Sequence, residues 1–79
     1  MKHWTALFTD SGGVIHAVAG ITELSDGRLN VAVASASGHR LEVGTWTLLE
    51  AEEMATAWVR KLLGKQVPRS RWTEVDVTL

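Results

Sequence analysis

The chain has 79 residues and a formal net charge of −1, which limits it to a single small domain spanning residues 1–79. An apolar fraction of 46% argues against disorder, and the absence of cysteine excludes disulfides and cysteine-based metal sites. No run approaches ~18 consecutive apolar residues, and the first residues lack the apolar core of a signal peptide. We therefore expect a cytoplasmic protein that does not enter a membrane.

Turn clusters rich in Gly, Ser and Asp divide the first half of the sequence into apolar, β-branched runs. The clusters at 10–13, 25–27 and 37–39 are spaced as in an antiparallel meander. Asp26-Gly27 is the strongest hairpin signal, since a type I′ turn requires positive φ at both central residues. The sequence predicts four strands, over residues 3–9, 14–24, 29–36 and 40–47.

After Thr47 the apolar residues recur with the spacing of an amphipathic helix. Thr47 and Glu50 have the spacing of a capping box, and Gly64 is a typical residue at a helix C-terminus. The stripe expected to face the sheet consists of Ala51, Met54, Ala55, Trp58, Val59, Leu62 and Leu63.

The tail over residues 72–79 alternates and predicts a fifth strand at a sheet edge. Thr73, Val75, Val77 and Leu79 would lie on one side. Whether this strand pairs within its own chain or with a neighbour is open. The predicted fold class is α+β, a four- to five-stranded antiparallel meander sheet with one amphipathic helix packed on one face, in the order β-β-β-β-α-β.

Register arithmetic predicts that both faces of the sheet are apolar. An Asp26-Gly27 turn that pairs Leu24 with Leu29 separates the strands into two faces. The first, expected under the helix, carries Leu24, Leu29, Val31, Val33, Leu41 and Val43. The second has a floor of small residues, Ala6, Ala17, Ala19, Ala32, Ala34 and Ala36, with Trp4, Phe8, Ile15, Ile21 and Trp46 around it.

The register of the fourth strand depends on the length of the third turn. We expect a three-residue loop over 37–39, because a two-residue turn would place Glu42 against Val33 on a buried face, where a charge is costly.

One helix covers one face, so the second face needs a partner. We expect a small non-enzymatic interaction or assembly domain that forms a homo-oligomer, a dimer or larger, through that face. The residues expected at the interface are Trp4, Phe8, Ala17, Ala19, Ile21, Ala32, Ala34 and Trp46.

Nucleic-acid binding is the main alternative. Aromatic side chains on the sheet would stack on bases, and a basic segment would contact phosphates. The residues of this possible anion contact are Arg60, Lys61, Lys65, Arg69 and Arg71. A second alternative is a small apolar ligand bound where two chains meet.

Catalysis and metal binding have no support in the sequence. His3, His16 and His39 lack the spacing of metal ligands, and no nucleophile motif such as Gly-x-Ser-x-Gly occurs. Asp10-Ser11-Gly12-Gly13 leads into a strand, so it reads as a turn and not as a phosphate loop. We therefore expect no catalytic residues, no metal and no cofactor.

Overall fold

The computed structural model describes residues 1–76 of the chain. These residues form one five-stranded antiparallel sheet and one α-helix in the order β-β-β-β-α-β, which confirms the predicted fold class. The strands are β1 (Lys2–Thr9), β2 (Ile15–Glu23), β3 (Leu29–Ser35), β4 (Gly38–Gly44) and β5 (Thr73–Asp76), and the helix is α1 (Leu48–Leu63).

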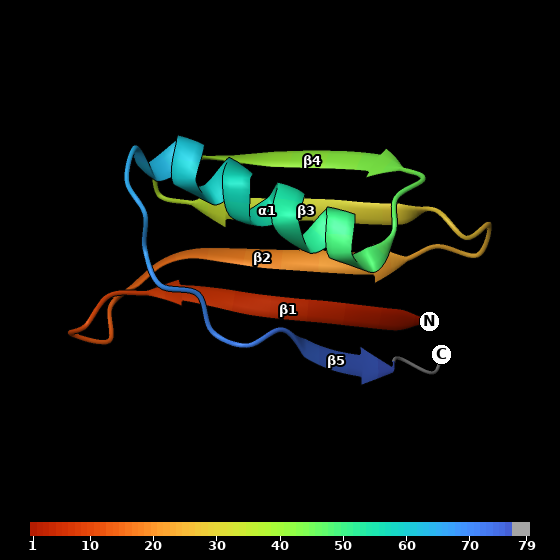
Figure 1. Cartoon of the computed structure of the whole chain (residues 1–79), viewed down its shortest axis with the longest axis horizontal. Coiled ribbons are helices and arrows are strands. Elements are labelled where there is room, and N and C mark those ends of the chain that lie inside the picture. The colour runs from red at the N-terminus through yellow and green to blue at the C-terminus, as the bar shows by residue number, and fades with distance from the viewer. Residues whose placement is uncertain (77–79) are drawn as a thin grey trace.

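The fifth strand pairs within its own chain. The strands β1 to β4 form a meander and β5 returns beside β1, so the order across the sheet is β4-β3-β2-β1-β5 (Figure 1). β5 runs antiparallel to β1, with Thr73 opposite Thr5 and Asp76 opposite Lys2. The predicted continuation of this strand through residues 77–79 lies outside the described residues.

The β2–β3 hairpin turns through a loop one residue longer than the predicted turn. The backbone N–H of Leu24 donates to the carbonyl of Arg28 over 2.8 Å, and Gly27 takes a left-handed conformation with φ 86°. A type I turn followed by a left-handed residue gives this three-residue loop. Leu29 therefore pairs with Glu23 and not with Leu24, so the predicted register was wrong.

This shift of one residue moves every β3 side chain to the opposite face of the sheet. Val31 and Val33 now share a face with Ala19 of β2, whereas Ala32 and Ala34 point the other way. The predicted division into a valine face and an alanine face was therefore wrong.

The β1–β2 hairpin keeps the predicted faces although its register also differs. The N–H of Asp10 donates to the carbonyl of Val14 over 3.0 Å, which closes another three-residue loop. A β-bulge between Phe8 and Thr9 adds a second shift. Because the two shifts together amount to two residues, the β1 side chains stay on their expected side.

The β3–β4 connection is a two-residue turn, the turn length that the sequence disfavoured, but it lies at residues 36–37, so Glu42 pairs with Val31 and not with Val33. Ser35 pairs with Gly38, and the Ser35 hydroxyl donates to the Gly38 carbonyl over 3.2 Å. The expected cost of burying Glu42 does not arise, because β4 is the edge strand and Glu42 is only half-buried. Its carboxylate accepts hydrogen bonds of 2.7 and 3.0 Å from Arg40, whose guanidinium lies 4.5 Å from the centre of the Trp58 ring.

The helix begins and ends at the predicted residues. The Thr47 hydroxyl accepts from the Glu50 N–H over 3.1 Å, and the Glu50 carboxylate accepts from the Thr47 N–H over 2.9 Å, which confirms the capping box. The hydrogen bond from the Thr47 backbone to the Glu50 carboxylate, followed by that from the Thr47 side chain, lowers the pKa of Glu50 below its ordinary value. At the other end Gly64 has φ 69°, and its N–H donates to the Arg60 carbonyl over 2.9 Å.

The predicted helical stripe faces the sheet, but it covers a different face from the one expected. Leu41 and Val43 lie on the uncovered side and are exposed, so their predicted place under the helix was wrong. Large valines of β3 fill the space beside small alanines of β1 and β2. The core under the helix comprises Trp4, Phe8, Ala17, Ala19, Ile21, Leu29, Val31, Val33, Ala51, Ala55, Trp58, Val59 and Val67.

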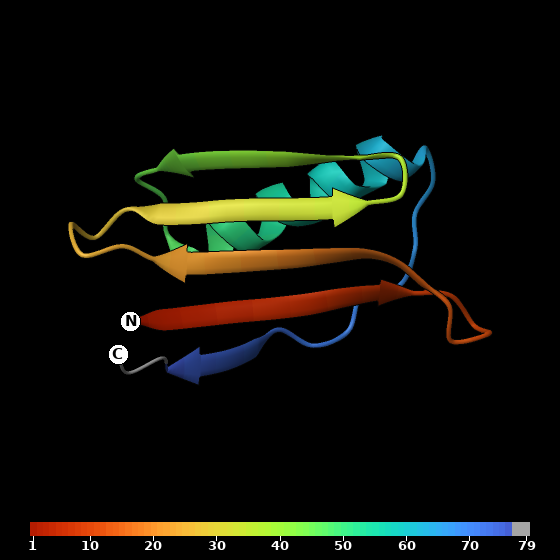
Figure 2. The same cartoon turned by 180° about the vertical axis from the view of Figure 1, so that it is seen from behind.

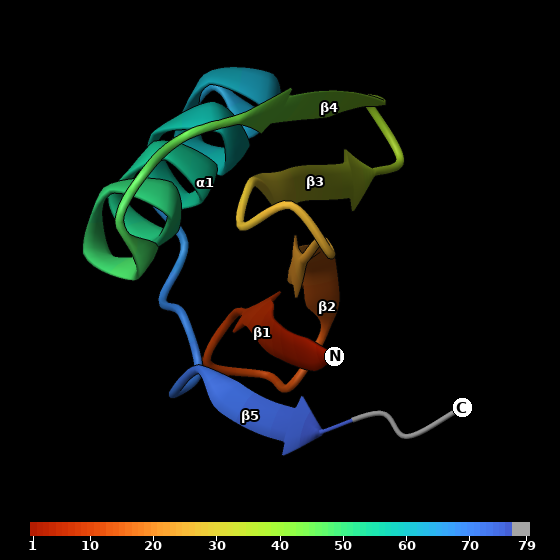
Figure 3. The same cartoon turned by 90° about the vertical axis from the view of Figure 1, so that its right-hand side faces the viewer.

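The helix lies off the centre of the sheet, packed against β2, β3 and β4. The segment 64–72 borders β1 on the same side: the Thr9 N–H donates to the Pro68 carbonyl over 3.1 Å, and the Ser70 N–H donates to the Leu7 carbonyl over 2.8 Å. The helix and this segment therefore lie on one side of the sheet, and neither crosses the other side (Figures 2 and 3).

Candidate functional site

The side of the sheet turned away from α1 carries no Asp, Glu, Lys or Arg in any of the described strands. We call this side the open face. Pairing and alternation place on it His3, Thr5, Leu7, His16, Val18, Gly20, Thr22, Asn30, Ala32, Ala34, His39, Leu41, Val43, Thr73 and Val75. The charged residues of the strands all point to the helix side: Lys2, Glu23, Arg40, Glu42, Glu74 and Asp76.

This distribution is the reverse of the usual one. The uncovered side of a monomeric antiparallel sheet normally carries the polar and charged residues. Here large apolar side chains are exposed on it, with Leu41 59% and Val18 43% accessible. A contiguous, charge-free apolar patch on a small protein marks an interaction surface.

The centre of the open face is a shallow hollow beside a ridge. Gly20 and Ala32 pair directly and present almost no side chain, and Leu7 pairs with Val18 in the neighbouring row. The hollow has a volume of about 700 Å³. His3 leans over it, since a Cβ placed on Gly20 would lie 3.4 Å from the His3 Cε1.

Two histidines of the open face have hydrogen-bonded partners. His3 Nδ1 lies 2.7 Å from the Thr22 hydroxyl, and His16 Nε2 lies 2.8 Å from the Asp10 carboxylate in the first loop. The His16 hydrogen bond, followed by that from the Val14 N–H, lowers the pKa of Asp10 below its ordinary value.

Five of the predicted interface residues belong instead to the core. Trp4, Phe8, Ala17, Ala19 and Ile21 are buried under the helix, Phe8 being 1% accessible. They kept the side of the sheet that the sequence predicted for them, but that side is the one that α1 covers. Their assignment to an exposed face was therefore wrong.

The other three residues of the predicted interface lie on different sides of the sheet. Ala32 and Ala34 lie on the open face. Trp46 follows β4 and packs against the core on the helix side, with its ring so close to Gly44 that an added Cβ there would meet it at 2.7 Å. Of the predicted interface, Ala32 and Ala34 remain available to a partner.

The sequence reasoning missed the residues that dominate the open face, above all Leu7, Val18 and Gly20. Leu41 and Val43 were assigned to a covered face. One signal could have placed Leu41 and Val43 on the open face. Along β4 these two residues alternate with Arg40 and Glu42, so the two charged residues lie on one side of the strand and Leu41 and Val43 lie on the other.

The predicted basic segment separates into two groups. Arg60 and Arg69 line a common cavity between α1 and the segment 66–69, whereas Lys61, Lys65 and Arg71 are exposed and do not line it. The aromatic platform proposed for nucleic acid is not available, because Trp4 and Phe8 are buried.

No group of three or more His, Asp or Glu side chains within residues 1–76 is arranged to bind a metal ion. In the same part of the chain, α1 falls short of the length and apolarity needed to cross a bilayer. No family model, no curated protein and no solved structure matches the chain. The class that the fold defines is a small α+β domain, a five-stranded antiparallel sheet layered with one helix.

Proposed function

We propose that this chain is a small non-enzymatic assembly domain that associates with a second copy of itself through the open face. The observation that carries the proposal is the absence of charged residues from that face, in a chain with 8 basic and 9 acidic residues. The cytoplasmic location expected from the sequence is part of the same proposal.

A second copy is the occupant that suits this surface best. A charged partner would find no countercharge on the open face, whereas two identical neutral faces meet without repulsion. The ridge at Leu7 and Val18 lies next to the hollow at Gly20 and Ala32, so a twofold arrangement can set each ridge in the partner's hollow. Small residues in the hollow allow two sheets to approach to about 10 Å, the spacing of a β-sandwich.

The available area also supports a dimer. β3 and β4 are 7 residues long, and β1 and β2 are slightly longer. At ~4.8 Å between strands and ~3.3 Å per residue, four such strands have a flat footprint of roughly 450 Å². Because side chains corrugate the face, two copies would bury on the order of 1,000 Å² or more, the lower bound for a specific interface.

Analytical ultracentrifugation over a range of concentrations tests the proposal, with Ala34→Glu as the disrupting variant. Ala34 is exposed, so the carboxylate is tolerated by an isolated chain. At a twofold interface it would be buried twice without a countercharge, which costs enough to raise the dissociation constant about 100-fold or more.

Ala57→Glu is the matched control, since Ala57 is exposed on α1 and far from the open face. We expect the wild type and Ala57→Glu to form dimers, and Ala34→Glu to be a folded monomer by circular dichroism. A wild-type chain that stays monomeric at millimolar concentration refutes the proposal, as does an Ala34→Glu variant that dimerises like the wild type.

A further inference from the structure

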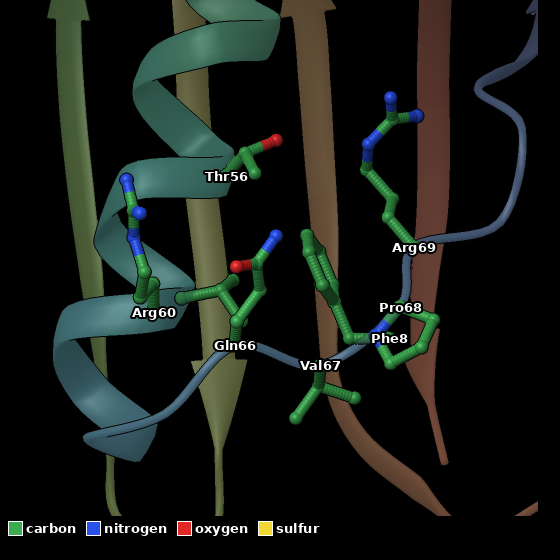
Figure 4. A pocket seen from close by; sticks show the side chains of 8 residues that line it. Phe8, Thr56, Arg60, Gln66, Val67, Pro68 and Arg69 are labelled. Carbon is green, nitrogen blue, oxygen red and sulfur yellow. The ribbon is translucent and has the colours of Figure 1, made fainter. Parts of the chain in front are cut away.

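A cavity of about 320 Å³ lies on the side of the molecule opposite the open face, between α1 and the segment that returns to β1. It exists because the helix sits off the centre of the sheet, leaving a gap beside residues 66–69. Figure 4 shows Arg60 on the helix wall and Arg69 on the opposite wall, with Phe8 and Gln66 between them. Its size is at the lower end of the range of small-molecule sites.

Two arginines line this cavity without a carboxylate partner. Neither Arg60 nor Arg69 forms an ion pair with any acidic residue in the described part of the chain. Arg69 is held in place, since one of its nitrogens donates to the Ser70 carbonyl over 2.9 Å and its guanidinium lies 5.6 Å from the centre of the Trp72 ring. Two unneutralised guanidinium groups on facing walls favour an anion between them.

The acidic side chains nearest to this cavity lie beside a second, adjoining cavity. Glu52 and Glu53 line an adjoining cavity that Arg60 and Arg69 also border, while the lining of the first cavity includes no acidic residue. These two acidic side chains therefore lie at the end of the groove away from Gln66.

The floor of the cavity is apolar and selects the kind of anion. It consists of Phe8, Val59, Val67 and Pro68. The Thr56 hydroxyl already donates to the Glu52 carbonyl over 2.9 Å, so the exposed Gln66 amide is the neutral donor left for a ligand. Phe8, Val59 and Val67 are buried, so the exposed Pro68 ring is the apolar surface that a ligand can reach. An inorganic ion would leave this ring without contacts, whereas a hydrocarbon chain would pack against it.

We propose that this cavity binds a small organic carboxylate, with the carboxylate between Arg60 and Arg69 and a short hydrocarbon chain against the Pro68 ring. The site is independent of self-association, because it lies across the sheet from the open face. Of the five residues predicted to contact an anion, this proposal uses two, Arg60 and Arg69. The proposed ligand is a small monoanion and not the phosphate backbone of a nucleic acid.

The test is to titrate the full chain with hexanoate, acetate and inorganic phosphate in turn. Binding is measured by calorimetry and by changes in amide chemical shifts in NMR spectra. We expect hexanoate to bind more tightly than acetate and phosphate, and to shift the amides of residues 56–60 and 66–69. Arg60→Gln and Arg69→Gln should each lose about tenfold or more in affinity, as expected for removing a charge-assisted hydrogen bond.

Each variant has a neighbouring control with the same change of charge: Lys61→Gln for Arg60→Gln, and Arg71→Gln for Arg69→Gln. Both controls should bind hexanoate like the wild type. Equal loss in the controls, phosphate binding as tightly as hexanoate, or no binding at all overturns the proposal. Repeating the titration in Ala34→Glu separates this result from the proposed self-association, since that variant should bind hexanoate unchanged.

Discussion

Replacing the strand glycines Gly44 and Gly20 with alanine should have opposite effects on stability. In Gly44→Ala the new Cβ would lie 2.7 Å from both Cη2 and Cζ2 of Trp46, closer than any van der Waals contact. The ring must move out of its place against the core, at an overpacking cost of about 1–3 kcal/mol. The added Cβ also reduces the conformational entropy of the unfolded chain, which stabilises the fold by about 0.4–1 kcal/mol. We therefore expect the free energy of unfolding to fall by about 1–2 kcal/mol in total.

Gly20→Ala is the matched comparison on the opposite face. Its Cβ would lie 3.4 Å from the His3 ring and 4.0 Å from the Trp4 carbonyl oxygen, both ordinary contacts. The unfolded-state effect then stands alone and stabilises by about 0.4–1 kcal/mol. For a domain of this size, Gly44→Ala should lower the melting temperature by roughly 5–10 °C and Gly20→Ala should raise it by a few degrees.

Thermal unfolding followed by circular dichroism measures both changes. Both substitutions belong in the Ala34→Glu background, so that self-association does not make the melting temperature depend on protein concentration. The double variant Gly44→Ala/Trp46→Leu should lose less stability than the sum of its single changes, because the clash is removed with the ring. Equal melting temperatures for Gly44→Ala and Gly20→Ala would refute this account of the packing at Trp46.

Two further predictions concern the helix cap. Thr47→Ala should cost about 1 kcal/mol and lower the melting temperature, whereas Thr45→Ala, an exposed position without a cap, should leave it unchanged. Because the pKa of Glu50 is lowered in the folded state, its contribution to stability is present at neutral pH and lost as the pH falls below 4.5; Glu50→Gln should remove that part of the acid-unfolding curve.

Local signals along the chain predicted the elements well, because each depends on a few neighbouring residues. The helix is an example: Thr47, Glu50 and Gly64 define its ends by backbone hydrogen bonds that any sequence of that spacing can form. The order of β1 to β4 followed in the same way from short connections, whereas the sequence left the partner of β5 open.

The pairing of strands was harder to predict, because one residue in a loop reverses a whole strand. Asp26-Gly27 suits both a two-residue turn and a three-residue loop with Gly27 in the left-handed position. The choice moved Val31 and Val33 under the helix and Ala32 and Ala34 to the open face. What decides between the two loops is the packing of β3 against α1, which no local pattern contains.

The β3–β4 turn shows how the same choice defines the candidate site. A three-residue loop would have directed Arg40 and Glu42 to the open face and Leu41 and Val43 towards the helix side. The two-residue turn does the reverse, and it is tolerated because the Arg40 side chain can pair with Glu42 and rest against Trp58 at the edge of the helix layer. The register that gives these two charges a place beside the helix is therefore also the one that leaves the open face without charge.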